Sequence, residues 1–130
     1  MKKLAIFVAL ILPMFFTSCE FEEADFGFPK KVSFSNKGGE KVICGSQSFT
    51  YANIYNYKNG ENGKIIESDS VTVFEYDWLR IEYKDLEGKH FAEDLKIVAQ
   101  PNLTNKSREL NIEVCSGTEY QVITVKQDKL

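Results

Sequence analysis

The stretch ELNIEVCSGTEYQVITVK, from Glu109 to Lys126, decides the fold of this chain. Its first part alternates apolar and polar residues, with Leu110, Ile112 and Val114 on one side, as in a strand with one buried face and one wet face. The next four residues place Gly117 where a tight turn needs a positive φ. The stretch therefore predicts two paired antiparallel strands joined by a short turn.

Similar short runs, rich in Val, Ile, Tyr and Phe, recur along the chain and are separated by clusters of Gly, Asn, Asp and Ser. No window beyond Lys31 keeps the apolar spacing of a helix for three turns. The pattern predicts an all-β, antiparallel sandwich or barrel. The predicted strands are Val32–Phe34, Lys41–Cys44, Phe49–Tyr57, Lys64–Ile66, Val71–Tyr76, Leu79–Tyr83, Leu95–Ala99, Glu109–Val114 and Tyr120–Lys126.

The beginning of the chain has the composition of an export signal. Two lysines precede the apolar run Leu4–Phe16, which at about 1.5 Å per residue spans roughly 20 Å as a helix, short of the ~30 Å hydrocarbon core of a bilayer. We therefore expect residues 1–18 to be a signal peptide that is removed, not a membrane anchor.

The residues Phe16-Thr17-Ser18-Cys19 resemble the lipobox of bacterial lipoproteins, in which the cysteine thiol is acylated and the cysteine becomes the new N-terminus. The alternative is an ordinary secretory signal followed by a chance cysteine. Several acyl chains on Cys19 would hold the protein stably at a membrane.

Length and charge limit the remaining chain. Removing 18 of the 130 residues leaves 112, enough for one domain. The cleavage also removes Lys2 and Lys3, which leaves 14 basic residues against 19 acidic ones, a net charge of −5. An acidic domain is a poor partner for nucleic acid or anionic lipid headgroups, because the phosphate interaction would be repulsive.

The mature part carries a set of residues whose order and spacing resemble a known family. The set comprises Val32-Ser33-Phe34, Gly38-Gly39-Glu40, Asp77-Trp78-Leu79, Asn102 with Arg108, and Ile123–Gln127. Over residues 32–129 the chain is similar to the BACON domain, the Bacteroidetes-associated carbohydrate-binding often N-terminal family. The resemblance implies an immunoglobulin-like β-sandwich, here of seven to nine strands, of a kind usually attached to glycan-degrading or glycan-binding modules at the cell surface.

The resemblance also bears on organisation and location. We expect an acidic tether at residues 19–31 and the sandwich domain at residues 32–130. The tether segment Glu20–Asp25 resembles the acidic signal that directs Bacteroidetes lipoproteins to the outer face of the outer membrane, although it also fits a plain solvated linker. We expect a lipid-anchored outer-membrane protein exposed at the cell surface.

Residues suited to catalysis are scarce. The chain has a single histidine, His90, and it lacks both a G-x-S-x-G elbow and a glycine-rich phosphate loop. Cys44, Cys115 and His90 do not have the short spacing of metal ligands. We therefore expect no catalytic residue, no metal and no cofactor. Cys115 has the opposite parity to Leu110, Ile112 and Val114 and should face outward, whereas Cys44 shares parity with Val42. We therefore also expect no core-crossing disulfide.

Trp78 and Arg108 are expected to be structural. Trp78 opens a predicted strand, and large aromatic residues at such positions usually fill the space between the sheets of a sandwich. Arg108 follows a loop, where its guanidinium can pair with backbone carbonyls or an acidic neighbour.

One strand presents a candidate ligand site. Tyr51, Asn53, Tyr55 and Tyr57 share one face of the predicted strand, and the residues between them suit the core. Aromatic rings can take the C–H faces of a sugar while amides take its hydroxyls. The alternative is that these tyrosines merely cover the sheet, since tyrosine fits strands well.

Three kinds of function remain open from the sequence, the third of which is an enzyme or inhibitor. The first is a non-catalytic surface module that binds carbohydrate or mucin glycans through the tyrosine row. The second is a structural, assembly or spacer lipoprotein that contacts other envelope proteins.

Replacing Cys19 by alanine should release the protein from the membrane fraction, because the acyl chains are its only predicted attachment. Fractionation of cells expressing the wild-type and C19A chains, followed by immunodetection, measures this partitioning. Unchanged membrane association of the variant would contradict the lipid anchor.

Overall fold

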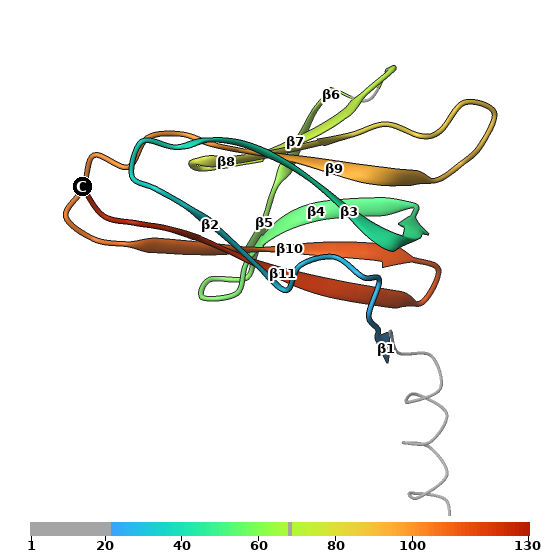
Figure 1. Cartoon of the computed structure of the whole chain (residues 1–130), viewed down its shortest axis with the longest axis horizontal. Coiled ribbons are helices and arrows are strands. Elements are labelled where there is room, and N and C mark those ends of the chain that lie inside the picture. Colours follow the sequence, from blue (N-terminus) through green and yellow to red (C-terminus); the bar gives the residue numbers. More distant parts are fainter. Residues whose placement is uncertain (1–21, 68) are drawn as a thin grey trace, which may run out of the picture.

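The computed structural model describes residues 22–67 and 69–130, so the predicted signal peptide and Cys19 lie outside the described residues. The described chain forms two β-sheets packed face to face (Figure 1). The first sheet contains β1 (Glu22–Glu23), β2 (Lys31–Phe34), β4 (Tyr51–Asn56), β5 (Glu61–Asn62), β10 (Arg108–Ser116) and β11 (Glu119–Gln127). The second sheet contains β3 (Gly39–Phe49), β6 (Lys64–Glu67), β7 (Thr72–Tyr76), β8 (Leu79–Tyr83) and β9 (Ala92–Ala99).

The hairpin β10–β11 is the centre of the first sheet. Leu110 lies opposite Val125, and Ile112 lies opposite Ile123, with all four side chains buried in the core. Cross-strand pairs of this kind fix the register, because a slip of one residue would turn the apolar side chains outward. The alternation in the sequence is therefore the direct cause of this hairpin.

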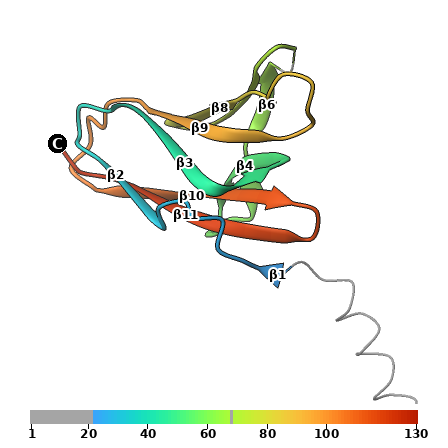
Figure 2. The ribbon, with the colours of Figure 1, turned by 45° about the vertical axis from the view of Figure 1, so that its right-hand side comes forward.

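The N-terminal strap, residues 22–34, runs along the edge of β11 that lies opposite β10 (Figure 2). β1 and β2 both pair with β11 in parallel, whereas residues 24–30 between them leave the ladder. Phe26 and Phe28 on this excursion enter the core, and Phe26 is fully buried. Burial of two phenylalanine rings fastens the strap to the sandwich.

The backbone of the strap is satisfied by a side chain of β11. Phe26 N–H donates to Gln121 Oε1 at 2.8 Å, and Gln121 Nε2 donates to Phe28 C=O at 2.9 Å. On the other side, Ser46 N–H donates to Phe26 C=O at 2.8 Å. A Cβ on Gly45 would lie 2.3 Å from that carbonyl oxygen, so the close approach of the strap requires glycine at this position.

The chain passes from one sheet to the other at Gly63. β5 pairs with β4, and β6 pairs with β7 immediately after Gly63. Gly63 N–H donates to Ile54 C=O at 2.8 Å. This crossover closes one side of the sandwich.

The far end of the sandwich is fixed by a stacked arginine. Trp78 is buried, and the Arg108 guanidinium carbon lies 4.7 Å from the centroid of its ring system. Arg108 Nη2 donates to the carbonyls of Gln100 and Pro101 at 3.2 Å each, and its Nε donates to Gln127 Oε1 at 2.8 Å. Trp78 thus packs in the core, and Arg108 binds loop carbonyls.

The all-β sandwich predicted from the sequence is confirmed, and the described residues form eleven strands instead of seven to nine. Each of the nine predicted strands has a counterpart. The additional strands β1 and β5 have only two residues each, too few for a pattern to show. The predicted strand 49–57 is broken at Thr50, where β3 ends and β4 begins.

The N-terminal boundary also differs from the predicted one. The sequence predicts a tether to residue 31 and a domain from residue 32. In the structure Glu22–Glu23 and Lys31 pair with β11, and Phe26 and Phe28 between them are buried in the core. The physical reason is the burial of Phe26 and Phe28. Within the described residues, the sandwich begins at Glu22.

Cys44 lies on β3 of the second sheet and Cys115 on β10 of the first sheet, and both are free cysteines in the structure. Across residues 22–67 and 69–130, no helix is long and apolar enough to span a bilayer.

Replacing Phe26 by alanine should lower the free energy of unfolding by about 3–5 kcal/mol, because it empties a fully buried site in the core. Urea denaturation followed by circular dichroism measures the change. The control is L103A at an exposed site, expected to change stability by less than about 0.5 kcal/mol. Equal midpoints for the two variants would show that the strap is not part of the folded domain.

Candidate functional site

Two hollows lie next to each other along β11. The outer-face hollow has a volume of about 510 Å³ and lies on the solvent face of the first sheet; its lining is Thr50, Tyr51, Tyr55, Glu113, Cys115, Gly117 and Tyr120. The edge hollow has a volume of about 560 Å³ and lies between the strap and β11; its lining is Glu23, Ala24, Asp25, Lys30, Gln121, Val122 and Thr124.

Three neighbouring strands build the outer-face hollow. In the sheet register Tyr51 of β4 lies opposite Cys115 of β10, which lies opposite Tyr120 of β11. These side chains alternate with the buried residues of the same strands and therefore point to the solvent face. Thr50 closes one end, where its N–H donates to Cys115 C=O at 2.9 Å.

Tyr57 packs beside Tyr55 and extends the aromatic surface beyond the lining of the hollow. Their rings are stacked, with centroids 6.4 Å apart and planes inclined by 30°. The Tyr57 hydroxyl donates to Glu113 Oε2, which holds a carboxylate beside the two rings. Tyr57 is 53% exposed and Tyr51 is 39% exposed, so much of this aromatic surface faces water.

Tyr51 is held from below by the core. Its ring meets that of Phe74 edge to face, with centroids 5.5 Å apart and planes at 84°. Its hydroxyl accepts a hydrogen bond from Asn53 Nδ2 at 3.1 Å. These two contacts restrict the position of the ring.

Asn53 differs from the expectation that it shares the exposed row. It is only 2% exposed, because the crossover at Gly63 covers it. Asn53 Nδ2 donates to Gly63 C=O at 3.3 Å, and a Cβ on Gly63 would lie 2.5 Å from Asn53 Oδ1. The structure thus brings Tyr51, Tyr55 and Tyr57 together on the surface and gives Asn53 a supporting place beneath them.

The surroundings keep the Tyr55 and Tyr57 phenols and the Cys115 thiol in their neutral forms. Burial and the nearby Tyr51 and Glu113 raise the pKa of Tyr55 to about 12. Burial and the hydrogen bond to Glu113 raise the pKa of Tyr57 as well. The pKa of the Cys115 thiol is raised by burial and by Glu113, which disfavours the nucleophilic thiolate. At neutral pH the site offers phenol hydroxyls, aromatic faces and a carboxylate.

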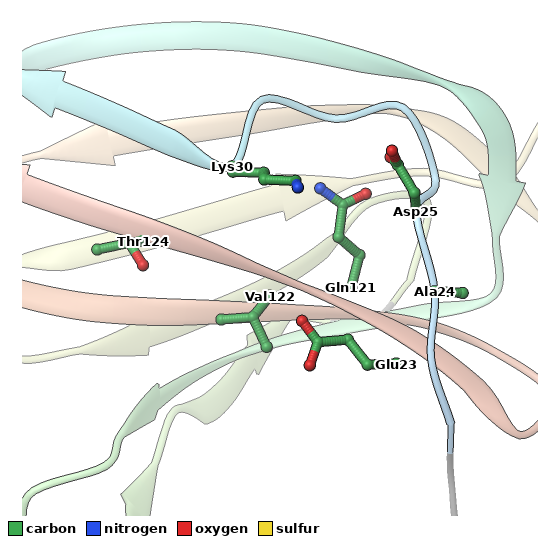
Figure 3. Close-up of a pocket in the computed structure, with 7 residues that line it drawn as sticks. All are labelled: Glu23, Ala24, Asp25, Lys30, Gln121, Val122 and Thr124. Carbon is green, nitrogen blue, oxygen red and sulfur yellow. The ribbon is translucent and has the colours of Figure 1, made fainter.

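The edge hollow is polar. Figure 3 shows the side chains of Lys30, Asp25 and Glu23 around the edge of β11, with the amide of Gln121 between strap and strand. Thr124 adds a hydroxyl, which donates to Asn111 Oδ1 at 3.2 Å. These groups are suited to hydrogen bonding with a polar ligand.

Within residues 22–67 and 69–130, no group of three or more His, Cys, Asp and Glu side chains is placed to hold a metal ion. Trp78 and Arg108 lie at the opposite end of the β10–β11 hairpin from the outer-face hollow.

Sequence reasoning did not select Glu113, Cys115 or Tyr120 for the site. A signal for Tyr120 was present, because pairing across the Ser116–Glu119 turn places it opposite Cys115 on the outward side. The edge hollow had no such signal, since it depends on where the strap leaves β11.

Comparisons with known proteins place the second half of the chain in a family. No curated protein matches the chain. A solved structure, "NMR structure of the protein from Bacteroides thetaiotaomicron", aligns with a TM-score of 0.45 and 16% identity over 85% of this chain and 86% of that chain. The family model of BACON, described as "Putative binding domain, N-terminal", matches residues 66–128 and confirms the resemblance found in the sequence. Residues 66–128, which supply Glu113, Cys115 and Tyr120 to the outer-face hollow, thus belong to the BACON family.

Proposed function

We propose that this protein is a non-catalytic, lipid-anchored cell-surface module that binds neutral carbohydrate through the outer-face hollow. The observation that carries the proposal is the gathering of Tyr51, Tyr55 and Tyr120 around one hollow on a sheet face, with the carboxylate of Glu113 among them. The BACON match supports a binding role in general.

The arrangement suits a sugar ring chemically. The faces of the exposed tyrosine rings can pack against the C–H groups of a pyranose, which are apolar. The Glu113 carboxylate can accept hydrogen bonds from sugar hydroxyls, and the Tyr55 phenol is protonated at neutral pH and can donate. A few polar groups on an aromatic wall are the usual composition of a small-molecule site.

Charge selects among the carbohydrates. Glu113 lies in the hollow, and the mature chain has five more acidic than basic residues. Sialylated or sulfated glycans would be repelled from such a surface, so neutral glycans, including those of mucins, are the proposed ligands. Each ring contributes modestly, and affinity should be weak, roughly millimolar to micromolar, unless many copies act together on one surface.

The proposed location depends on acylation of Cys19. Acylation there would tether the described domain, which begins at Glu22, close to the membrane surface. The acidic residues that follow Cys19 favour the outer face of the outer membrane as the site of display. A surface position would bring the domain into contact with extracellular glycans.

One observation favours the alternative role in assembly with envelope proteins. Ile65 and Ile66 of the edge strand β6 are 54% and 60% exposed, and exposed apolar residues on a strand edge are suited to contact with another protein. The glycan experiment below decides between the two functions, because an assembly module would retain no glycan.

Replacing both Tyr55 and Tyr57 by alanine should lower glycan affinity about tenfold or more, because it removes two stacked aromatic faces. Residues 22–130 of each variant are screened on arrays of neutral and sialylated glycans, and hits are measured by calorimetry. The matched control, Y55F with Y57F, keeps both rings and should retain most of the affinity. Melting temperatures should change little, since neither ring lies in the core.

Two results would contradict the proposal. Equal glycan affinity of the alanine pair and the wild type would place the site elsewhere on the domain. The absence of any retained glycan on wild-type protein would support the assembly role.

A further inference from the structure

The edge of β11 has a gap in its hydrogen-bonded ladder, between the two strands of the strap. Ala24 N–H donates to Tyr120 C=O at 2.7 Å, and Thr124 N–H donates to Lys30 C=O at 2.9 Å. Val122 lies midway between Tyr120 and Thr124 on the same edge, opposite the strap excursion. On this edge alternate residues direct their N–H and C=O groups toward the strap.

Both main-chain groups of Val122 lack a partner among the described residues. The pairing of β1 ends at Glu23 with Tyr120, and that of β2 begins at Lys31 with Thr124. On its other side Val122 lies opposite Glu113, whose neighbours on β10 carry the ladder bonds to β11. A strand edge rarely leaves such a donor and acceptor unpaired unless water or a ligand meets them.

Val122 lines the edge hollow, and its N–H and C=O point to the strap side of β11, where this hollow lies. Lys30, Asp25 and Glu23 line the same hollow and bring one ammonium and two carboxylates to it (Figure 3). The volume of about 560 Å³ lies within the roughly 300–1,000 Å³ of small-molecule sites. The hollow therefore combines a fixed main-chain donor and acceptor with flexible charged groups.

The edge hollow adjoins the outer-face hollow. Tyr120 lines the outer-face hollow and Val122 lines the edge hollow, and two residues on a strand are about 6.6 Å apart. Glu23 of the edge hollow is also the strand partner of Tyr120. A ligand longer than one sugar ring can therefore reach both hollows.

We propose that the edge hollow is a second subsite of the same surface and takes a vicinal diol from a neutral oligosaccharide. The N–H and C=O of one extended residue lie on the same side of the strand, so Val122 N–H donates to one hydroxyl oxygen and Val122 C=O accepts from its neighbour. Lys30 donates to a further hydroxyl. The inference rests on the proposed glycan function and adds chain-length dependence to it.

The test is an NMR titration of ¹⁵N-labelled residues 22–130 with two probes. Lacto-N-neotetraose is a neutral tetrasaccharide, and N-acetyllactosamine is its terminal disaccharide. The tetrasaccharide should shift the amide signals of Tyr51, Tyr55 and Val122 and bind about tenfold more tightly, whereas the disaccharide should shift only the two tyrosine amides.

A matched pair of variants isolates the main-chain donor. V122P removes the N–H without breaking a ladder bond, since proline is tolerated where a strand N–H is unpaired, and V122A keeps the N–H. V122P should lower tetrasaccharide affinity about tenfold, to the value of the disaccharide, while V122A should not. If V122P fails to fold, as judged from its spectrum, K30M replaces it and should lower tetrasaccharide affinity severalfold with unchanged disaccharide affinity.

The outcomes separate the two proposals. Shifts at Tyr51 and Tyr55 without a shift at Val122 would overturn the second subsite and leave the proposed function standing. Equal tetrasaccharide affinity of V122P and V122A would also overturn the second subsite and leave the proposed function standing. If neither probe shifts any of the three amides, both proposals are overturned for this class of glycan.

Discussion

The end of the sandwich that carries the two hollows depends on the hydrogen bonds of the Gln121 side-chain amide. Its oxygen accepts from Phe26 N–H and its nitrogen donates to Phe28 C=O, while the amide itself is buried. When an extended segment leaves a strand ladder, its backbone N–H and C=O groups lose their partners. Burying each of these groups unpaired would cost about 1–3 kcal/mol. Gln121 removes this cost and so allows the two phenylalanine rings to enter the core.

The edge hollow follows from this path of the strap. Because the strap departs from β11 after Glu23 and returns at Lys31, the main-chain groups of Val122 have no partner among the described residues and the edge hollow forms. Tyr120 faces outward because it alternates with the buried residues of β11, and the paired part of the strap lies beside it at the edge of that strand. Both hollows therefore lie toward the same end of the hairpin. The other end is closed by Arg108 stacked on Trp78 and has a structural role.

The sequence was sufficient where the determinants are local. The alternation around Ile112 fixes the hairpin β10–β11, and the position of Trp78 at the start of a strand predicts its burial, because both depend only on strand period and core packing. The same period correctly places the tyrosine row on the solvent side of β4. Strand parity alone predicts that Asn53 is exposed, but it is buried. The crossover at Gly63, ten residues later in the chain, covers it.

The strap could not be predicted in this way. Phe26 and Phe28 share strand parity, but acidic residues precede them and Pro29 follows, which is a composition typical of a linker. Their burial depends on Gln121, which is 95 residues from Phe26 in the sequence, and on the space left by Gly45. Contacts between such distant residues leave no periodic signal in a single sequence.

Hydrogen exchange of the individual backbone amides of β11 tests the central claim most directly, namely that the ladder is open at Val122. Thr124, which donates to Lys30 C=O, should be protected to nearly the global stability of the domain. Val122 N–H should exchange at least about a hundredfold faster, because it points to the strap side of β11, where the edge hollow lies, and has no partner among the described residues. Equal protection of Val122 and Thr124 in the unliganded protein would contradict the account.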